Sequence, residues 1–245
     1  MSTALIGRRA ELSWLRARVD VALGGFGHLV IVEGESGIGK TRLAQEALDH
    51  ARRRRASVLR GRCYDHLDLP YLPLRDSLFV AIAEAADSPA EREVLERVRA
   101  DAFDSSTSDA PEMIERDRTR TLLALTNLVL GYARTTPTVV FIDDVDWADT
   151  ATVDLLRHLM FRLDDEQVPL LVLATSRADP TARAAEGVAR LRSEPRTAVV
   201  HLNPLTQLEA TELARERQPG CPIDRARDLA TASGGNPLLV EALVR

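Results

Sequence analysis

The chain has 245 residues, a formal net charge of −5 at pH 7 and a pI of about 5.6. With 45% hydrophobic and 28% charged residues it falls among globular proteins, which excludes a disordered chain. The length suits one large α/β domain, or a core of about 200 residues with a small appendage. The acidic balance gives no overall attraction to DNA, RNA or an anionic membrane, so nucleic-acid binding would need another domain.

The residues that often mark metal centres, disulfides or membrane segments show no such pattern here. Cys63 and Cys221 lie far apart, without a CxxC motif or a neighbouring histidine, and we expect two reduced, buried thiols. The five histidines lack ligand spacing as well. No leader follows Met1 and no apolar run approaches the roughly 18 residues of a membrane span, so we expect a cytoplasmic protein.

The first predicted elements are a strand at 28–33 and a helix that begins at Thr41. The strand is a short run rich in β-branched residues with glycines on both sides. In the helix, apolar residues recur at helical spacing until an arginine run at 52–55, which suits the negative end of the helix dipole. The same arginines could instead form a phosphate or nucleic-acid patch.

The middle of the chain alternates strands with helices. Residues 138–142 are apolar after Thr138 and show no polar alternation, which is typical of a central parallel strand covered on both faces. The other predicted elements are a strand at 57–60, helices at 74–86 and 90–102, an exposed loop at 104–111, a long helix at 112–134, a helix at 150–163, and strands at 170–175 and 197–202.

The alternation predicts an α/β fold, a doubly wound parallel sheet. After Asn203 and Pro204 the pattern becomes purely helical, with helices at 206–217, 225–232 and 237–244. We therefore expect an α/β core at 1–203 and the start of a helical lid subdomain at 204–245.

Residues 34–41 match the pattern G-x-x-x-x-G-K-[ST] of a P-loop, between a predicted strand and a predicted helix. Glycines let consecutive N–H groups turn toward an anion, and the helix that follows directs its positive end to the same place. Lys40 would hold the β- and γ-phosphates, and Thr41 would supply a hydroxyl to Mg²⁺. The expected contacts to ATP or ADP are Gly34, Glu35, Ser36, Gly37, Ile38, Gly39, Lys40, Thr41 and Arg42.

Lys40 is also the chain's sole lysine among 32 basic residues. Arginine serves at every other basic position. A compact ammonium on a flexible stem fits a tight phosphate-wrapping loop in a way that a planar guanidinium does not. This chemical argument supports the P-loop independently of the motif.

Three charged residues follow two of the predicted strands. Asp143 is the expected Mg²⁺ ligand together with Thr41, and Asp144 is placed to orient or deprotonate the attacking water. Both could instead serve a turn or a helix cap. Arg177 follows the strand at 170–175, where it could sense the γ-phosphate or form a surface salt bridge. The expected catalytic residues are Lys40, Asp143, Asp144 and Arg177.

With these motifs the chain resembles a signal-transduction ATPase with numerous domains (STAND). Within that family it is most similar to the N-terminal ATPase module of large ATP-binding LuxR-type regulators. The resemblance covers nearly the whole chain and rests on the P-loop and on residues 5–12, 61–64, 69–71, 143–149, 174–177 and 235–239.

The resemblance implies further roles. Ile6 and Arg8 would contact the adenine, Pro237 would close on the base, and Arg177 would sense the γ-phosphate. Such proteins alternate between a closed ADP-bound rest state and an open ATP-bound state that self-associates. They also carry winged-helix, repeat and DNA-binding parts, so we expect the chain to be a fragment and DNA to be contacted through other domains.

The leading hypothesis is an ATPase that works as a switch. We expect its turnover to be slow, because no trans-acting arginine is identifiable in the sequence. A non-catalytic nucleotide-binding scaffold and an AAA+-type nucleic-acid motor or loader are the alternatives, and the acidic balance argues against the motor. A small-molecule kinase is the weakest rival, because no acceptor-binding constellation stands out.

Overall fold

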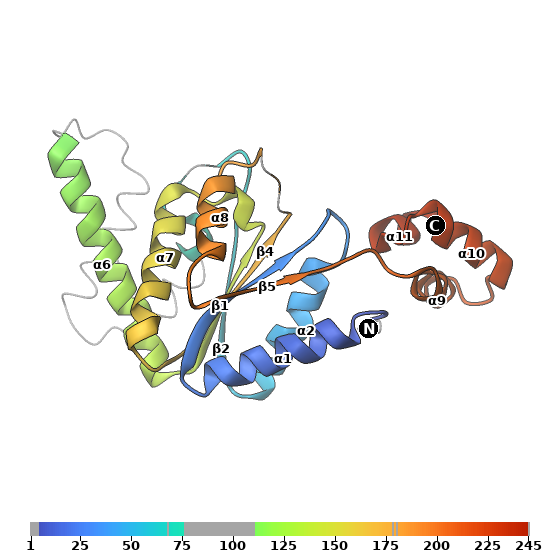
Figure 1. Ribbon diagram of the computed structural model, residues 1–245, viewed down its shortest axis with the longest axis horizontal. Coiled ribbons are helices and arrows are strands. Elements are labelled where there is room, and N and C mark those ends of the chain that lie inside the picture. The colour runs from blue at the N-terminus through green and yellow to red at the C-terminus, as the bar shows by residue number, and fades with distance from the viewer. Residues whose placement is uncertain (1–4, 68, 76–110, 178, 180, 245) are drawn as a thin grey trace.

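The computed structural model describes residues 5–67, 69–75, 111–177, 179 and 181–244 (Figure 1). Five strands form one sheet in the order β2-β3-β4-β1-β5, and all four pairings are parallel. The strands are β1 (Phe26–Glu33), β2 (Ser57–Arg62), β3 (Thr138–Asp143), β4 (Val168–Ser176) and β5 (Thr197–His201). A parallel sheet with helices on both faces confirms the predicted fold class.

The apolar strands feed two hydrophobic cores, one on each face of the sheet. In β3, Val139 and Phe141 belong to one core, whereas Val140 and Ile142 belong to the other. Side chains of a strand alternate between its faces, so a strand covered on both sides needs apolar residues at every position. This is why 138–142 shows no polar alternation.

Different helices cover the two faces (Figure 1). One core is closed by α1 (Arg9–Leu23) and α2 (Lys40–Arg53), and the other mainly by α6 (Pro111–Thr135), α7 (Thr150–Asp165) and α8 (Ala185–Arg192). The last turn of α2 carries Arg52 and Arg53, as expected for the negative end of a helix dipole. No helix in the described ranges is both long enough and apolar enough to cross a bilayer.

Beyond β5 the chain forms α9 (Gln207–Arg217), α10 (Ile223–Ala232) and α11 (Pro237–Val244), which we call the lid helices. They stand apart from the helices that flank the sheet (Figure 1). Their buried residues form a third hydrophobic cluster that includes Leu213, Ala226 and Val240. A capping box between Thr206 and Glu209 starts α9.

The predicted strands agree with the observed ones to within two residues at each end, and the helices at 112–134, 150–163, 206–217, 225–232 and 237–244 are confirmed. Two longer helices, α1 and α8, have no counterpart among the predicted elements. The predictions at 74–86, 90–102 and 104–111 lie almost wholly outside the described residues. Of their ends, 74–75 belong to the short helix α3 (Leu72–Arg75), and Pro111 opens α6.

Candidate functional site

The charged motifs meet at the carboxyl edge of the sheet. The register pairs Ile142 of β3 with Ala174 of β4, and Ser176 of β4 with Glu33 of β1. Gly34, Asp143 and Arg177 therefore leave neighbouring strands at the same edge, which is where open α/β sheets bind ligands.

The P-loop wraps between β1 and α2 through three glycines with positive φ. Gly34, Gly37 and Gly39 have φ of +153°, +78° and +101°, values that residues with a side chain rarely adopt. Ile38, only 1% exposed, anchors the loop in the core beneath it. Because α2 begins at Lys40, its free N–H groups point into the loop.

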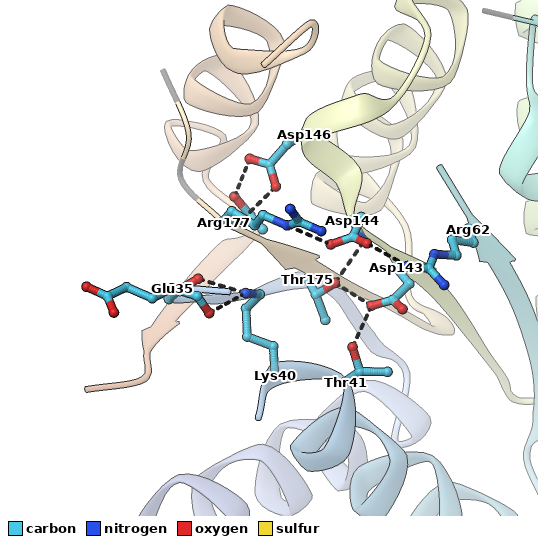
Figure 2. Close-up of polar contacts among 11 residues, drawn as sticks. Glu35, Lys40, Thr41, Arg62, Asp143, Asp144, Asp146, Thr175 and Arg177 are labelled. Atoms are coloured by element: carbon cyan, nitrogen blue, oxygen red, sulfur yellow. Dashed lines mark hydrogen bonds and ion pairs between the residues drawn. The ribbon is translucent and has the colours of Figure 1, made fainter. Parts of the chain in front are cut away.

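The ammonium group of Lys40 lies across the mouth of this loop (Figure 2). It donates hydrogen bonds to the carbonyl oxygens of Gly34 at 2.7 Å and Glu35 at 2.9 Å. Burial lowers the pKa of Lys40 below its ordinary 10.5, and the nearby Asp144 carboxylate opposes that shift. The loop thus holds its positive charge where a phosphate chain would run.

Asp143 and Thr41, the predicted metal ligands, are brought together (Figure 2). The Thr41 hydroxyl donates to Oδ1 of Asp143 at 2.9 Å, and the Thr175 hydroxyl donates to the same oxygen at 2.7 Å. Thr175 also accepts the backbone N–H of Asp144 at 2.9 Å. A hydroxyl and a carboxylate side by side are the hard oxygen ligands that suit Mg²⁺.

Asp144 lies between two arginines. Its Oδ2 is 3.2 Å from Nη2 of Arg62, and its Oδ1 is 3.4 Å from Nε of Arg177. Its backbone is left-handed (φ 56°, ψ 52°), an uncommon conformation for a residue with a side chain and one that recurs at functional sites. The structure thus joins the predicted Asp144 and Arg177, and it adds Arg62.

A cavity of about 360 Å³ opens over these residues, within the size range of small-molecule sites. Its polar lining comes from residues 36–42 of the P-loop and the first turn of α2, together with Arg62, Asp143, Asp144 and Arg177. Its apolar lining is made by Leu5, Ile6, Leu205, Leu213, Pro237 and Leu238. All three residues expected on the adenine side, Ile6, Arg8 and Pro237, line the cavity, whereas Gly34 and Glu35 contribute the carbonyls held by Lys40.

Arg8 is buried and bound to the protein on several sides. Its guanidinium donates to the carbonyls of Ile38 at 3.3 Å and Asn203 at 2.6 Å, and it pairs with Glu11 at 3.2 Å. It therefore ties α1, the P-loop and the segment after β5 together at the edge of the cavity.

The lid contacts the P-loop directly. The Asn236 side chain donates to the carbonyl of Ser36 at 2.9 Å, and the backbone N–H of Leu238 donates to the carbonyl of Gly37 at 3.3 Å. Arg217 and Glu241, an ion pair between α9 and α11, also line the cavity.

Sequence reasoning missed the roles of Arg62, Thr175 and Asn236, although each lies in a segment that carried the family resemblance. Their contacts depend on which strands and helices are neighbours in space. Strand pairing between β2 and β3, for example, places Arg62 beside Asp143.

A strand, a glycine-rich anion loop and a helix, with a carboxylate at the end of another strand of the same sheet, define a P-loop nucleotide site. A profile of the AAA ATPase domain family matches residues 4–173, and the chain belongs to this family. It is 26% identical over 268 residues to an uncharacterized protein of Rhizobium meliloti (strain 1021), a match covering 99% of this chain and 25% of that protein. The chain thus spans about a quarter of the length of this curated relative.

Solved structures share the fold. A STAND protein with a tetratricopeptide repeat sensor from Pyrococcus horikoshii is 21% identical, with a TM-score of 0.58 over 99% of this chain and 30% of that one. The ORC2 protein of Aeropyrum pernix is 17% identical, with a TM-score of 0.55 over 100% of this chain and 62% of that one. AMPPCP-bound DnaA from Aquifex aeolicus is 15% identical, with a TM-score of 0.53 over 99% of this chain and 62% of that one. The fold is therefore that of P-loop ATPases of the STAND and AAA+ type.

Proposed function

We propose that this chain is the ATP-binding, slowly hydrolysing switch module of a multidomain signalling or transcriptional regulator, as in LuxR-type proteins. The observation that carries the proposal is the cavity itself, which is lined both by the P-loop and by lid residues Pro237 and Leu238. A nucleotide in this cavity touches both parts, so its phosphate state can bias how they sit together.

Binding rests on the loop and its lysine. The N–H groups of the P-loop and the Lys40 ammonium surround the phosphates, while Thr41 and Asp143 offer oxygens to Mg²⁺. When bound there, Mg²⁺ neutralises charge on the phosphate oxygens. Ile6, Arg8 and Pro237, which also line the cavity, enclose the adenine.

Hydrolysis and sensing rest on Asp144 and Arg177. Asp144 positions the attacking water or takes its proton, and Arg177 reports the γ-phosphate. The Arg177 guanidinium already faces an anion, the Asp144 carboxylate, so a γ-phosphate competes with that carboxylate for it. We expect turnover to be slow, because no trans-acting arginine finger is identifiable in the sequence.

The proposal includes the wider organisation expected from the sequence. Residues 1–203 form the ATPase core and 204–245 the beginning of the lid, in a cytoplasmic protein that self-associates in its ATP state. Contacts with DNA belong to other domains of the full regulator.

The test compares nucleotide states of the purified protein. We expect ADP to copurify and particle mass to grow with a non-hydrolysable ATP analogue but not with ADP. Lys40→Ala should abolish binding, and Asp144→Asn should keep binding while lowering turnover. Unaided turnover above about 10 per second, in the range of ordinary metabolic enzymes, would contradict the switch.

The same purified protein and variants distinguish the proposed switch from two alternative functions. A non-catalytic scaffold predicts that Asp144→Asn leaves both turnover and assembly unchanged. A nucleic-acid motor or loader is favoured by the fold shared with a DnaA that was solved with single-stranded DNA and opposed by the net charge of −5. Salt-sensitive DNA binding by this chain would support the motor.

A further inference from the structure

Asp146 is a buried carboxylate that the mechanism above does not use. It lies in the 3₁₀ turn at Val145–Trp147, two residues after Asp144, and is only 2% exposed. Burying a carboxylate is unfavourable unless hydrogen bonds compensate for the lost water. Its partners therefore indicate what the carboxylate does.

Both carboxylate oxygens of Asp146 bind the end of β4 (Figure 2). Oδ1 accepts the hydroxyl of Ser176 at 2.8 Å, and Oδ2 accepts the backbone N–H of Arg177 at 2.6 Å. The Asp146 carbonyl accepts the N–H of Ala184 at 2.9 Å, which fixes the turn on its other side. The carboxylate is therefore directed at the main chain from which the Arg177 side chain departs.

Arg177 is held at two points by the same turn. Asp144 contacts its guanidinium at 3.4 Å, and Asp146 contacts its backbone. A γ-phosphate competes only for the guanidinium contact, so the backbone contact persists in either nucleotide state.

We propose that Asp146 is a positioning residue that fixes the main chain of Arg177, so that its guanidinium reaches the γ-phosphate. This role rests on the proposed sensing function of Arg177. When a group that contacts the bound nucleotide is displaced by about 1 Å, the rate of the reaction can fall by about two orders of magnitude.

The test is the preference for a non-hydrolysable ATP analogue over ADP, both with Mg²⁺, measured as a ratio of dissociation constants by calorimetry. The ratio is insensitive to a loss of folded protein, because both nucleotides bind the same folded fraction. Asp146→Asn keeps the shape but removes the negative charge, so the hydrogen bond from the Arg177 N–H is no longer charge-assisted and the amide must donate to the Ser176 hydroxyl. We expect the preference to fall by about tenfold, with ADP affinity little changed.

A double-mutant cycle identifies the route of the effect. If Asp146 acts through Arg177, Asp146→Asn adds nothing to Arg177→Ala, whereas independent effects would add. Additive losses would overturn the positioning role.

Asp149 provides the matched control. It too is a buried carboxylate of the same segment, 6% exposed, but it caps α7 through the Thr152 N–H at 2.8 Å and accepts the Tyr71 N–H at 3.2 Å. Asp149→Asn should lower the melting temperature and leave the nucleotide preference unchanged.

The outcomes distinguish a failure of the positioning role of Asp146 from a failure of the sensing role of Arg177. An unchanged preference in Arg177→Ala contradicts the sensing role, and the positioning role falls with it. If the nucleotide preference changes in Arg177→Ala but stays the same in Asp146→Asn, only the positioning role is contradicted. If Asp146→Asn does not fold, Ser176→Ala frees one oxygen of the same carboxylate and should lower the preference about threefold; no change would overturn the proposal.

Discussion

The side-chain amide of Asn236 donates a hydrogen bond to the main-chain carbonyl of Ser36 at 2.9 Å, across 200 positions of sequence. The N–H of Leu238 reaches the next carbonyl, that of Gly37, at 3.3 Å. The phosphate-binding loop and α11 therefore form one hydrogen-bonded unit. The shape of the loop and the position of the lid are coupled.

Gly37→Ala should separate the lid from the loop. A Cβ at this position would lie 2.7 Å from Cβ of Leu238 and 2.9 Å from Oδ1 of Asn236, and φ is +78°. We expect affinity for ADP to fall by about tenfold, since lid contacts are lost from the cavity. Thermolysin should also cleave the segment 203–206 faster.

Gly220→Ala is the control for Gly37→Ala. Gly220 also has a positive φ, +87°, but nothing in the described part of the chain lies within 4 Å of its added Cβ. It should lose about 1 kcal/mol of folding stability through backbone strain alone. Equal effects of the two variants on nucleotide affinity would show that the lid contact is irrelevant to binding.

Thr175→Val should weaken the metal site. The Thr175 hydroxyl donates to Asp143 at 2.7 Å and accepts the Asp144 N–H at 2.9 Å, so valine leaves a buried N–H unpaired and removes one of the two hydroxyls that hold Oδ1 of Asp143. We expect a loss of about 1 to 3 kcal/mol in the free energy of unfolding. The Mg²⁺ dependence of ATP binding should shift to concentrations about tenfold higher.

Thr126→Val is the matched comparison for Thr175→Val. Thr126 is fully buried, and the one partner that its hydroxyl has within the described ranges is the carbonyl of Leu122, one turn earlier in α6. Its replacement should leave the Mg²⁺ dependence unchanged. A shift of similar size in both variants would assign the effect to general loosening of the fold.

Nucleotide binding should weaken at alkaline pH because of Lys40. Burial lowers the pKa of Lys40 below 10.5, and phosphate binding requires the ammonium form. Affinity should therefore be constant below the pKa of the free protein and fall by up to about tenfold per pH unit above it. Titrations with ADP between about pH 7 and 10 measure this, and Lys40→Arg should bind weakly but without the alkaline decline.

The contribution of Lys40 to folding stability changes with pH in the opposite direction to its contribution to nucleotide affinity. A lowered pKa in the folded state means that the unfolded chain binds more protons in the window between that pKa and 10.5. The contribution of Lys40 to the free energy of unfolding therefore rises with pH across this window. A parallel decline of affinity and melting temperature would point to alkaline unfolding instead.

Neither cysteine should react in the folded protein. Cys63 and Cys221 are 3% and 5% exposed, and burial, aided by the carboxylate of Asp149, raises the pKa of the Cys63 thiol well above 9.0. Ellman's reagent at about pH 8 should detect no thiol until denaturant is added, and then two. Rapid reaction of one equivalent without denaturant would contradict this burial.

Local sequence was enough to predict the strands and the P-loop. Their signals are short: an apolar run covered on both faces, glycines at fixed spacing and a single lysine. Asp143 was predictable because it directly follows such a run. Helix α1 escaped prediction because no Ser, Thr, Asp or Asn caps its start; the residue before it, Arg8, makes no side-chain capping bond.

Contacts between residues of different strands could not be predicted from the local sequence. The sheet order places β4 between β3 and β1, which sequence order does not reveal. Only this pairing brings the Thr175 hydroxyl to Asp143 and the Arg177 backbone to Asp146. A threonine at the end of a strand looks the same whether or not a carboxylate faces it from the next.

The burial of Arg8 has a mechanical consequence. One guanidinium joins the start of α1, the carbonyl of Ile38 and the carbonyl of Asn203, in the segment that leads from β5 to the lid helices. Because these three segments share one side chain, a displacement of any of them is transmitted to the other two, and through Ile38 to the P-loop.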